Sequence, residues 1–373
     1  MSLPCRYRFP SLKLLVRPLA IAFMVAVLWP FLRALAADPN GPPFKDPDDA
    51  IKYYSAAITS DPSNGEAFRE RGLAWIKKGD DGKALSDFDR AVSISPRDYV
   101  ALANRGAIWA ARGFQDKAML DLDRAVWLGP GHAEIYFDRG LLWGDLDRYD
   151  QAMKDFDKAI ALKPDYAKAY LFRGRILLDN NEVEKALADF SACIRYNPKE
   201  ARAYFYRGLT LDRKGDLPAA LADLNQAVEL DSKQDRFYFH RGDVLAKMGE
   251  YKKALSDLDR AVEINRDFLR AFYRRGTVQA ALGHHERALD DYNQALTILS
   301  LARNLSSSMM EAFLKTNDWI PDCFYHRALS YEAKGRIKDA ADDAHRAAFL
   351  RPGTKDFEAL KARLAAAVAA AAK

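Results

Sequence analysis

One dipeptide recurs along the chain at a fixed interval. Arg-Gly stands every 34 residues from Arg71-Gly72 to Arg275-Gly276, and a further copy, Arg327-Ala328, follows 52 residues later. An insertion at about residues 303–320 accounts for the longer last interval. A period of this length indicates a repeat protein, in which each unit buries its apolar side against its neighbours. The length of 373 residues therefore gives no independent domain count.

Other positions keep a fixed distance from the repeated glycine. An aromatic residue or Leu stands four residues before it, and small residues stand twelve and nineteen residues after it. The large residues four before and three after it share one face of a first helix because they are seven apart. The glycine between them leaves room for a second helix, whose small residues allow close packing. Gly, Asn or Asp follows the first helix, and these residues accept the left-handed conformation that ends a helix.

On these positions the chain resembles the tetratricopeptide repeat (TPR) family over about residues 48–354. The resemblance implies an all-α fold, an α-solenoid in which antiparallel helix pairs form a right-handed superhelix. The first helices would line a concave groove that binds protein or peptide partners. The expected order is a half repeat at 48–64, seven repeats at 65–302, the insertion at 303–320, an eighth repeat at 321–354 and an Ala-rich capping helix at 355–373.

One pair of residues goes beyond the general family pattern. An Asp stands fifteen residues after each repeated glycine, and it accompanies the preceding Arg in every copy. Carboxylates in one column would repel without cations nearby, so we predict a ladder of bidentate, partly buried ion pairs. A polar strip for a ligand is the alternative. The predicted pairs are Arg71 and Asp87, Arg105 and Asp121, Arg139 and Asp155, Arg173 and Asp189, Arg207 and Asp223, Arg241 and Asp257, Arg275 and Asp291, and Arg327 and Asp343.

The face expected to line the groove carries aromatic rings and a basic row. The rings stand three residues before the glycine and are Phe137, Phe205, Phe239, Tyr273 and Tyr325. The basic row stands six residues before it and is Lys168, Arg202, Arg236 and Arg270. Aromatic and Arg side chains are common binding hot spots, so an extended peptide with acidic and apolar groups would fit. Alternatively, the rings pack against adjacent first helices and the basic row is a solvated edge.

The insertion has an apolar helical face of its own. Met309, Met310, Phe313 and Leu314 lie together on that face, and Trp319 follows. An extra helix that covers the solenoid is one interpretation. A docking element is the other, since Met-rich surfaces adapt to ligands.

The N-terminus has the parts of a secretory signal peptide. Residues 1–18 are basic, residues 19–32 are uncharged and mostly apolar, and Ala34-Leu35-Ala36 follows. This order predicts a signal peptide at 1–36, a Pro-rich linker at 37–47 and an exported, periplasmic protein. The apolar core is shorter than the about 20 residues that span a bilayer. An uncleaved membrane anchor at 19–32 and a mitochondrial-type presequence are the alternatives.

Charge and motifs exclude several classes of function. Beyond residues 1–37 the numbers of basic and acidic side chains are equal, whereas a nucleic-acid-binding protein would have excess Lys and Arg. Three cysteines give neither a disulfide scaffold nor a zinc-binding spacing, and no nucleophile elbow or phosphate loop occurs. We therefore predict a non-catalytic adaptor or scaffold of the cell envelope, without cofactor or metal. The alternative is an accessory or regulatory subunit of an envelope enzyme, or weak catalysis in the groove.

Overall fold

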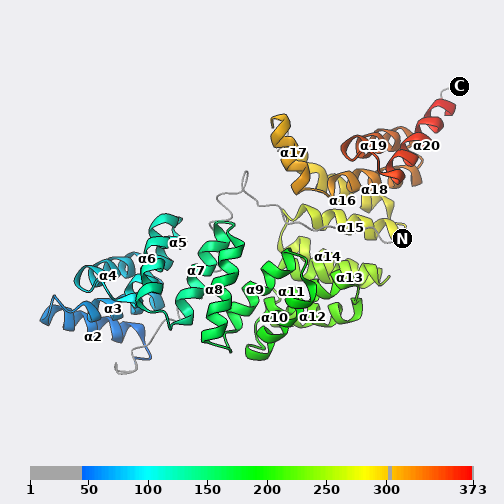
Figure 1. Ribbon diagram of the computed structural model, residues 1–373. Helices are drawn as coiled ribbons and strands as arrows, with labels where there is room; N and C mark the ends of the chain where they lie inside the picture. Colours follow the sequence, from blue (N-terminus) through cyan, green and yellow to red (C-terminus); the bar gives the residue numbers. More distant parts are fainter. Residues whose placement is uncertain (1–43, 301–304, 372–373) are drawn as a thin grey trace. The chain divides into compact units, whose positions relative to one another are not determined.

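The computed structural model describes residues 44–300 and 305–371, and helices are the only regular elements among them (Figure 1). These residues form two compact units that divide after Asn180. Successive helices pack in pairs within each unit. The predicted all-α solenoid fold is thereby confirmed.

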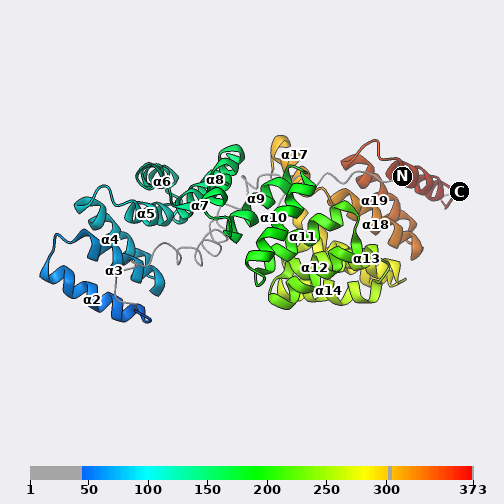
Figure 2. The same ribbon diagram turned by 60° about the horizontal axis from the view of Figure 1, so that its bottom comes forward.

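In its described residues, the N-terminal unit has one leading helix followed by alternating first and second helices (Figure 2). The leading helix α2 (Pro47–Ser60) packs against α3. The first helices are α3 (Gly65–Lys78), α5 (Tyr99–Ala111), α7 (Ala133–Asp145) and α9 (Ala167–Asp179). The second helices are α4 (Asp81–Ile94), α6 (Gln115–Leu128) and α8 (Tyr149–Leu162).

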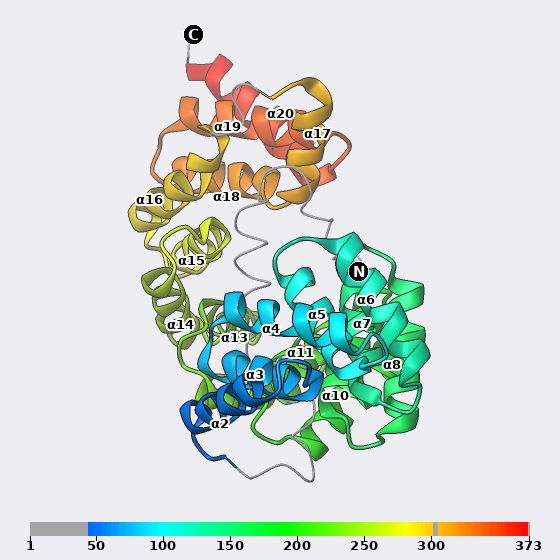
Figure 3. The same cartoon turned by 90° about the vertical axis from the view of Figure 1, so that its left-hand side faces the viewer.

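The C-terminal unit begins with the second helix α10 (Val183–Tyr196) and then follows the same alternation. Its first helices are α11 (Ala201–Lys214), α13 (Asp235–Lys247), α15 (Leu269–Ala281) and α18 (Ile320–Ala333). Its second helices are α12 (Leu217–Leu230), α14 (Tyr251–Ile264), α16 (His285–Leu296) and α19 (Ile337–Leu350). The 3-10 helix η1 (Thr297–Ser300) and α17 (Ser307–Thr316) interrupt the alternation before α18. The last helix, α20 (Lys355–Ala371), packs against α19 and buries Phe357, Leu360 and Leu364 (Figure 3).

The turns inside the helix pairs follow the sequence pattern. Glycines with positive φ end or follow the first helices at Gly79, Gly113, Gly215, Gly249, Gly283 and Gly335. Asp147 and Asn181 occupy the same place in the two copies without glycine, and their φ angles are 58° and 63°. Asp and Asn are the non-glycine residues that best tolerate this conformation. The backbone therefore takes the same left-handed conformation at this position in every copy.

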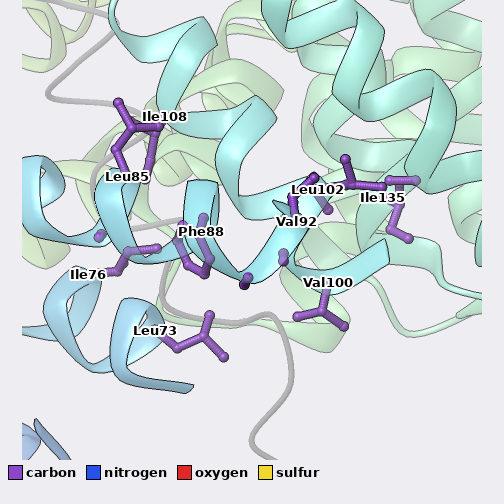
Figure 4. Close-up of a cluster of buried hydrophobic side chains, with 14 residues drawn as sticks. Leu73, Ile76, Leu85, Phe88, Val92, Val100, Leu102, Ile108 and Ile135 are labelled. Carbon is purple, nitrogen blue, oxygen red and sulfur yellow. The ribbon is translucent and has the colours of Figure 1, made fainter. Parts of the chain in front are cut away.

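Close approach of paired helices explains the repeated glycine. A Cβ atom placed on Gly72 of α3 would lie 2.8 Å from the ring of Phe88 on α4. Phe88 is fully buried, and Figure 4 shows it in a cluster that joins Leu73 and Ile76 of α3 to Leu85 of α4. The same cluster extends to residues of α5 and α7, so the first three repeats are packed against one another.

The predicted signal peptide at 1–36 and most of the linker at 37–47 lie outside the described residues. Within the described residues, no helix has both the length and the apolar character needed to cross a membrane.

Candidate functional site

The repeated Arg and Asp side chains form side-on bidentate ion pairs between the two helices of a repeat. In six copies Nε and Nη2 of the Arg donate to the two carboxylate oxygens at 2.6 to 2.9 Å, and these copies are Arg71, Arg105, Arg139, Arg207, Arg241 and Arg327. Arg275 donates to Asp291 at 2.6 to 3.2 Å. All seven carboxylates are buried, so a cation is required beside each of them.

Arg173 and Asp189 belong to different units, and their pairing stays a prediction. Arg173 does donate from Nη1 to Asp157 of α8 at 2.7 Å. This second contact is not particular to Arg173, because the Nη1 atom of every Arg in the column has an acceptor on the preceding second helix.

The Nη1 acceptors form a column of their own, seventeen residues after the glycine. Arg105 donates to Asp89 at 2.9 Å, Arg207 to Ser191 at 3.2 Å and Arg327 to Asn293 at 2.7 Å. The remaining acceptors are Ser55, Asp123, Asp157, Asn225 and Asp259. Sequence reasoning missed this column, although an Asp, Asn or Ser stands there in every copy that another Arg follows. Each guanidinium therefore joins its own repeat to the one before it.

A second face of the first helices is turned away from the paired helix. Positions six and two residues before the glycine, and one and five after it, lie about 100 to 160 degrees around the helix from the glycine. We call this surface the first-helix face. It contains the predicted basic row, and the predicted aromatic column lies at its margin.

Most of the predicted aromatic column is buried between repeats. Phe137, Phe205, Phe239 and Tyr273 are buried, and Tyr325 is partly exposed. Each ring lies against an aromatic side chain of the next repeat along the chain or, for Tyr325, of the C-terminal helix α20. The ring partners are Tyr166 for Phe137, Phe237 for Phe205, Phe268 for Phe239, Trp319 for Tyr273 and Phe357 for Tyr325. These contacts are the alternative that the sequence left open, in which the rings pack against neighbouring elements. The four buried rings can support a bound partner only from beneath the surface.

The predicted basic row lies in the first turn of successive first helices. Lys168 of α9 belongs to the N-terminal unit and is partly exposed. In the C-terminal unit Arg202 is partly buried and donates to Glu200 at 2.7 Å. Arg236 is exposed and Arg270 is partly exposed. The row therefore lies on accessible surface at the edge of the first-helix face.

A polar network crosses the first-helix face of the C-terminal unit. Lys247 of α13 donates to both oxygens of Asp212 of α11 at 2.7 Å, and it lies 3.2 Å from Asp243. Asp243 also pairs with Arg274 of α15. Burial would raise the pKa of the Asp243 carboxyl, but Arg274 and Lys247 outweigh burial and lower it. Asp212 and Asp243 are thus each paired with a cation, and Arg and Lys side chains outnumber Asp and Glu on this face.

His240 lies beside this network and does not add charge to it. Its ring packs against Phe205 and Phe239, with ring centroids at 5.4 and 4.9 Å. Burial lowers the pKa of His240 to about 3. The imidazole is therefore neutral at physiological pH, and the excess positive charge of this face comes from Arg and Lys alone.

The first-helix face of the N-terminal unit has the opposite character. Glu66 and Glu70 of α3 share Arg69 as their partner, and Asp98 uses the same Arg at 3.2 Å. Farther along the unit, the same face carries Glu134, Asp138 and Asp145 on α7 and Asp179 on α9. Acidic side chains outnumber basic ones on this face.

The insertion contributes to the core of the C-terminal unit. Phe313 of α17 and Trp319 are buried in one cluster with Tyr292 and Phe324. The Trp319 ring stacks on Tyr273 at a centroid distance of 5.8 Å. Met309 is exposed, and Met310 and Leu314 are partly buried against the cluster. The apolar face predicted from the sequence thus covers the last repeats.

The described residues offer few groups for catalysis. They contain no set of three or more His, Cys, Asp or Glu side chains placed to hold a metal ion. Cys193 and Cys323 are buried free thiols. Burial raises the pKa of the Cys193 thiol to about 12 and raises that of Cys323 as well. Both therefore remain protonated and unreactive at neutral pH.

Four family models match the chain, and each describes a tetratricopeptide repeat. The matched residues are 45–99 and 171–235, 105–177, 235–268, and 269–298. The chain belongs to the tetratricopeptide repeat family. No curated protein is similar enough to match it.

Solved TPR structures share this fold at low sequence identity. The hetero-tetramer Cut9-Hcn1 of the APC/C matches with a TM-score of 0.56 and 15% identity, over 85% of this chain and 58% of that one. PilF from Pseudomonas aeruginosa matches with a TM-score of 0.50 and 18% identity, over 59% of this chain and all of that one (100%). A TPR protein from Parabacteroides merdae ATCC 43184 has a TM-score of 0.49 and 20% identity, over 68% of this chain and 98% of that one. The matches to tetratricopeptide repeat models support a role in protein interaction.

Proposed function

We propose that this TPR protein is a non-catalytic adaptor of the cell envelope. It binds protein or peptide partners on its first-helix faces, and the face of the C-terminal unit takes a partner with acidic side chains. The excess of arginine on that face is the observation that carries the proposal.

The basic row provides anchoring points at regular spacing. Arg202, Arg236 and Arg270 stand at the same position of α11, α13 and α15, one repeat apart. A guanidinium can bind a carboxylate through two parallel hydrogen bonds, which gives both affinity and orientation. Asp212 and Asp243 are already paired with Lys247 and Arg274, so an acidic group bound at Arg236 and Arg270 would leave those ion pairs in place, whereas one bound at Arg202 would compete with Glu200.

Binding of a labelled acidic peptide to the full chain tests this site. The probe is an eight-residue peptide of Glu, Leu and Ser, measured by fluorescence anisotropy at low salt. The variant Arg202→Glu/Arg236→Glu/Arg270→Glu should bind at least about tenfold more weakly, because three attractive charges become repulsive. The matched control is Lys252→Glu/Arg266→Glu/Arg287→Glu, which makes the same charge change at exposed residues elsewhere in the C-terminal unit. Equal losses in the two variants would mean that only net charge matters.

The envelope location is supported by the order of charge and hydrophobicity in residues 1–37. Expression with and without residues 1–36, followed by fractionation and intact-mass measurement, tests it. A mature form that begins after Ala36 in the exported fraction is the expected result. Retention of Met1 in the exported protein contradicts it. So does a chain that is exported without residues 1–36 but not with them.

A further inference from the structure

The geometry points to a second partner site on the N-terminal unit, where Asp138 and Asp145 of α7 bind two basic side chains of an extended peptide. This inference rests on the proposed binding role of the first-helix face. It goes beyond that role because it assigns opposite partner chemistry to the other unit.

The two carboxylates are arranged on one face of α7. Asp138, Leu141 and Asp145 are three and four residues apart, which places them on the same side of a helix. Seven residues correspond to about 10 Å along the helix axis. An extended peptide in the polyproline II conformation has three residues per turn and a rise of about 3.1 Å, so two side chains three residues apart lie on the same side, about 9 Å from each other.

Neither carboxylate has a partner in the part of the chain that the structure describes. No hydrogen bond and no ion pair within 4.0 Å joins Asp138 or Asp145 to another described residue. The contrast is with the repeated Asp column, in which Asp121 and Asp155 each have a bidentate Arg. Asp243 on the other unit also differs from these two acids, because Lys247 and Arg274 both lie beside it. Asp138 and Asp145 are thus the half-buried acids of this face that remain available for a cation.

The surroundings of both carboxyls disfavour an uncompensated negative charge. Burial raises the pKa of Asp138 to about 7, and Lys168 offsets that effect only in part. Burial also raises the pKa of Asp145 to about 7, against a smaller opposing effect of Arg175. A cation brought into contact would relieve the unfavourable charge, so its binding would be favoured more than at a solvated carboxylate.

The neighbouring helix adds an independent polar group and free space. Asn104 of α5 is fully buried, and its Oδ1 atom has no hydrogen-bond partner among the described residues. Asn104 shares its face of α5 with Ala107 and Ala111, three and seven residues later. Helices α5 and α7 are in contact. A Cβ atom placed on Gly144 of α7 would meet nothing within 4 Å.

A peptide fits this face better than a compact ion. The small side chains Ala107, Ala111 and Gly144 leave room for a backbone beside the two carboxylates, and no metal-binding group of residues exists among those described. An acidic partner would be repelled by Glu134, Asp138 and Asp145 together. Charge complementarity therefore selects a segment with Lys or Arg at two positions three residues apart.

Anisotropy with a ten-residue Gly/Ser/Ala peptide that carries two lysines three positions apart tests the inference. The full chain should bind this probe at pH 8 and low salt, and Asp138→Asn/Asp145→Asn should bind it about tenfold more weakly or worse. The matched control is Asp116→Asn/Asp150→Asn, which removes the same charge from exposed positions on α6 and α8. Thermal melts followed by circular dichroism check that both variants fold.

Three results would overturn the inference. They are no binding of the lysine peptide by the unaltered chain, equal weakening in the two double variants, and equal binding of a peptide with glutamates in place of the lysines. The acidic-peptide site is tested independently, by the effect of substitutions at Arg202, Arg236 and Arg270 on binding of the acidic peptide. A chain that binds the acidic peptide but not the lysine peptide keeps its proposed function and loses this second site.

Discussion

Arg105 on α5 reaches back to Asp89 on α4, the second helix of the preceding repeat, with 2.9 Å between Nη1 and Oδ1. The Nε and Nη2 atoms of the same side chain bind Asp121 on α6. One guanidinium thus fixes three helices, because its planar fork of donors serves two acceptors in different directions. The polar column sets the register inside each repeat and also between repeats.

Removal of one arginine from this column should destabilise the protein strongly. In Arg207→Ala, the carboxylate of Asp223 keeps its burial but loses both donated hydrogen bonds. Breaking a buried pair typically costs about 3–5 kcal/mol, and the partial exposure of the guanidinium places the expected loss toward the lower end. Urea unfolding followed by circular dichroism measures the change.

Lys214→Ala is the control for that experiment. Its ammonium lies 3.8 Å from Glu184, and both side chains are exposed. Exposed pairs contribute about 0–1 kcal/mol, so the unfolding midpoint should barely move. Equal midpoints for the two variants would show that the buried column does not stabilise the fold.

The contact between repeats should be weaker and sensitive to salt. Asp123 accepts from Nη1 of Arg139 at 2.9 Å, but about half of its side chain is exposed. A double-mutant cycle of Arg139→Lys and Asp123→Ala should give a coupling free energy of about 0.5–1 kcal/mol at low salt. Asp123→Asn keeps an acceptor and should retain part of it. A coupling that is zero at low salt, or unchanged in 1 M NaCl, would contradict this interpretation.

The sequence predicts the framework well because its constraints are local. Each turn needs one residue that accepts a positive φ, and Gly, Asp147 or Asn181 supplies it at a fixed place. Each helix pair needs a gap at the contact, and the repeated glycine supplies that. The pairing of the repeated Arg with the repeated Asp can be predicted because each position keeps one residue type in every copy.

Burial of the aromatic column could not be predicted in the same way. The ring that covers each member comes from a different place in the next repeat, as Phe237 inside α13 and Trp319 before α18 show. The Nη1 acceptors mix three residue types, so they do not form an obvious column. Whether Asp138 reaches a cation depends on distances of a few ångströms to α9, which spacing along the chain does not give.

The N-terminal unit should lose stability as pH rises from about 4 to about 7. The pKa values of Asp138 and Asp145 rise from 3.8 to about 7 on folding, so the folded state holds protons that the unfolded chain has released. Stability therefore falls with pH across that window. Thermal melts at pH 5.5 and 8.0 should show a smaller pH dependence for Asp138→Asn/Asp145→Asn than for the unaltered chain.

The groups around these carboxyls do not reverse the sign. Asp138 faces Lys168, Glu134 and Tyr166, and Asp145 faces Arg175 and Asp147. The double variant removes only the two carboxyls, so every other charged group contributes alike to both proteins. An identical pH dependence in the unaltered chain and the double variant would show that the two carboxyls ionise normally.

Replacing the repeated glycine by alanine should destabilise the protein, because the steric clash of the new methyl group outweighs the better helix propensity of alanine. In Gly106→Ala the new Cβ would lie 3.0 Å from Leu122 and 3.2 Å from the backbone oxygen of Ala118. A backbone atom cannot move aside cheaply, so we expect a net loss of about 1–3 kcal/mol. Gly144→Ala is the matched helical control, because its Cβ meets nothing within 4 Å, and it should gain up to about 1 kcal/mol. Stabilisation by both substitutions would mean that the paired helices can separate slightly without penalty.

Helix α17 of the insertion should stabilise the fold through its buried side chain and not through its exposed one. Phe313 of α17 is buried in the cluster that contains Tyr292 and Phe324, whereas Met309 is exposed on the same helix. Phe313→Ala should lower the free energy of unfolding by about 3 kcal/mol or more, because it leaves a cavity among rings that cannot close around it. Met309→Ala should change it by less than about 0.5 kcal/mol. If Phe313→Ala leaves the urea midpoint unchanged, α17 does not cover the core in solution, and the docking interpretation of the insertion gains support.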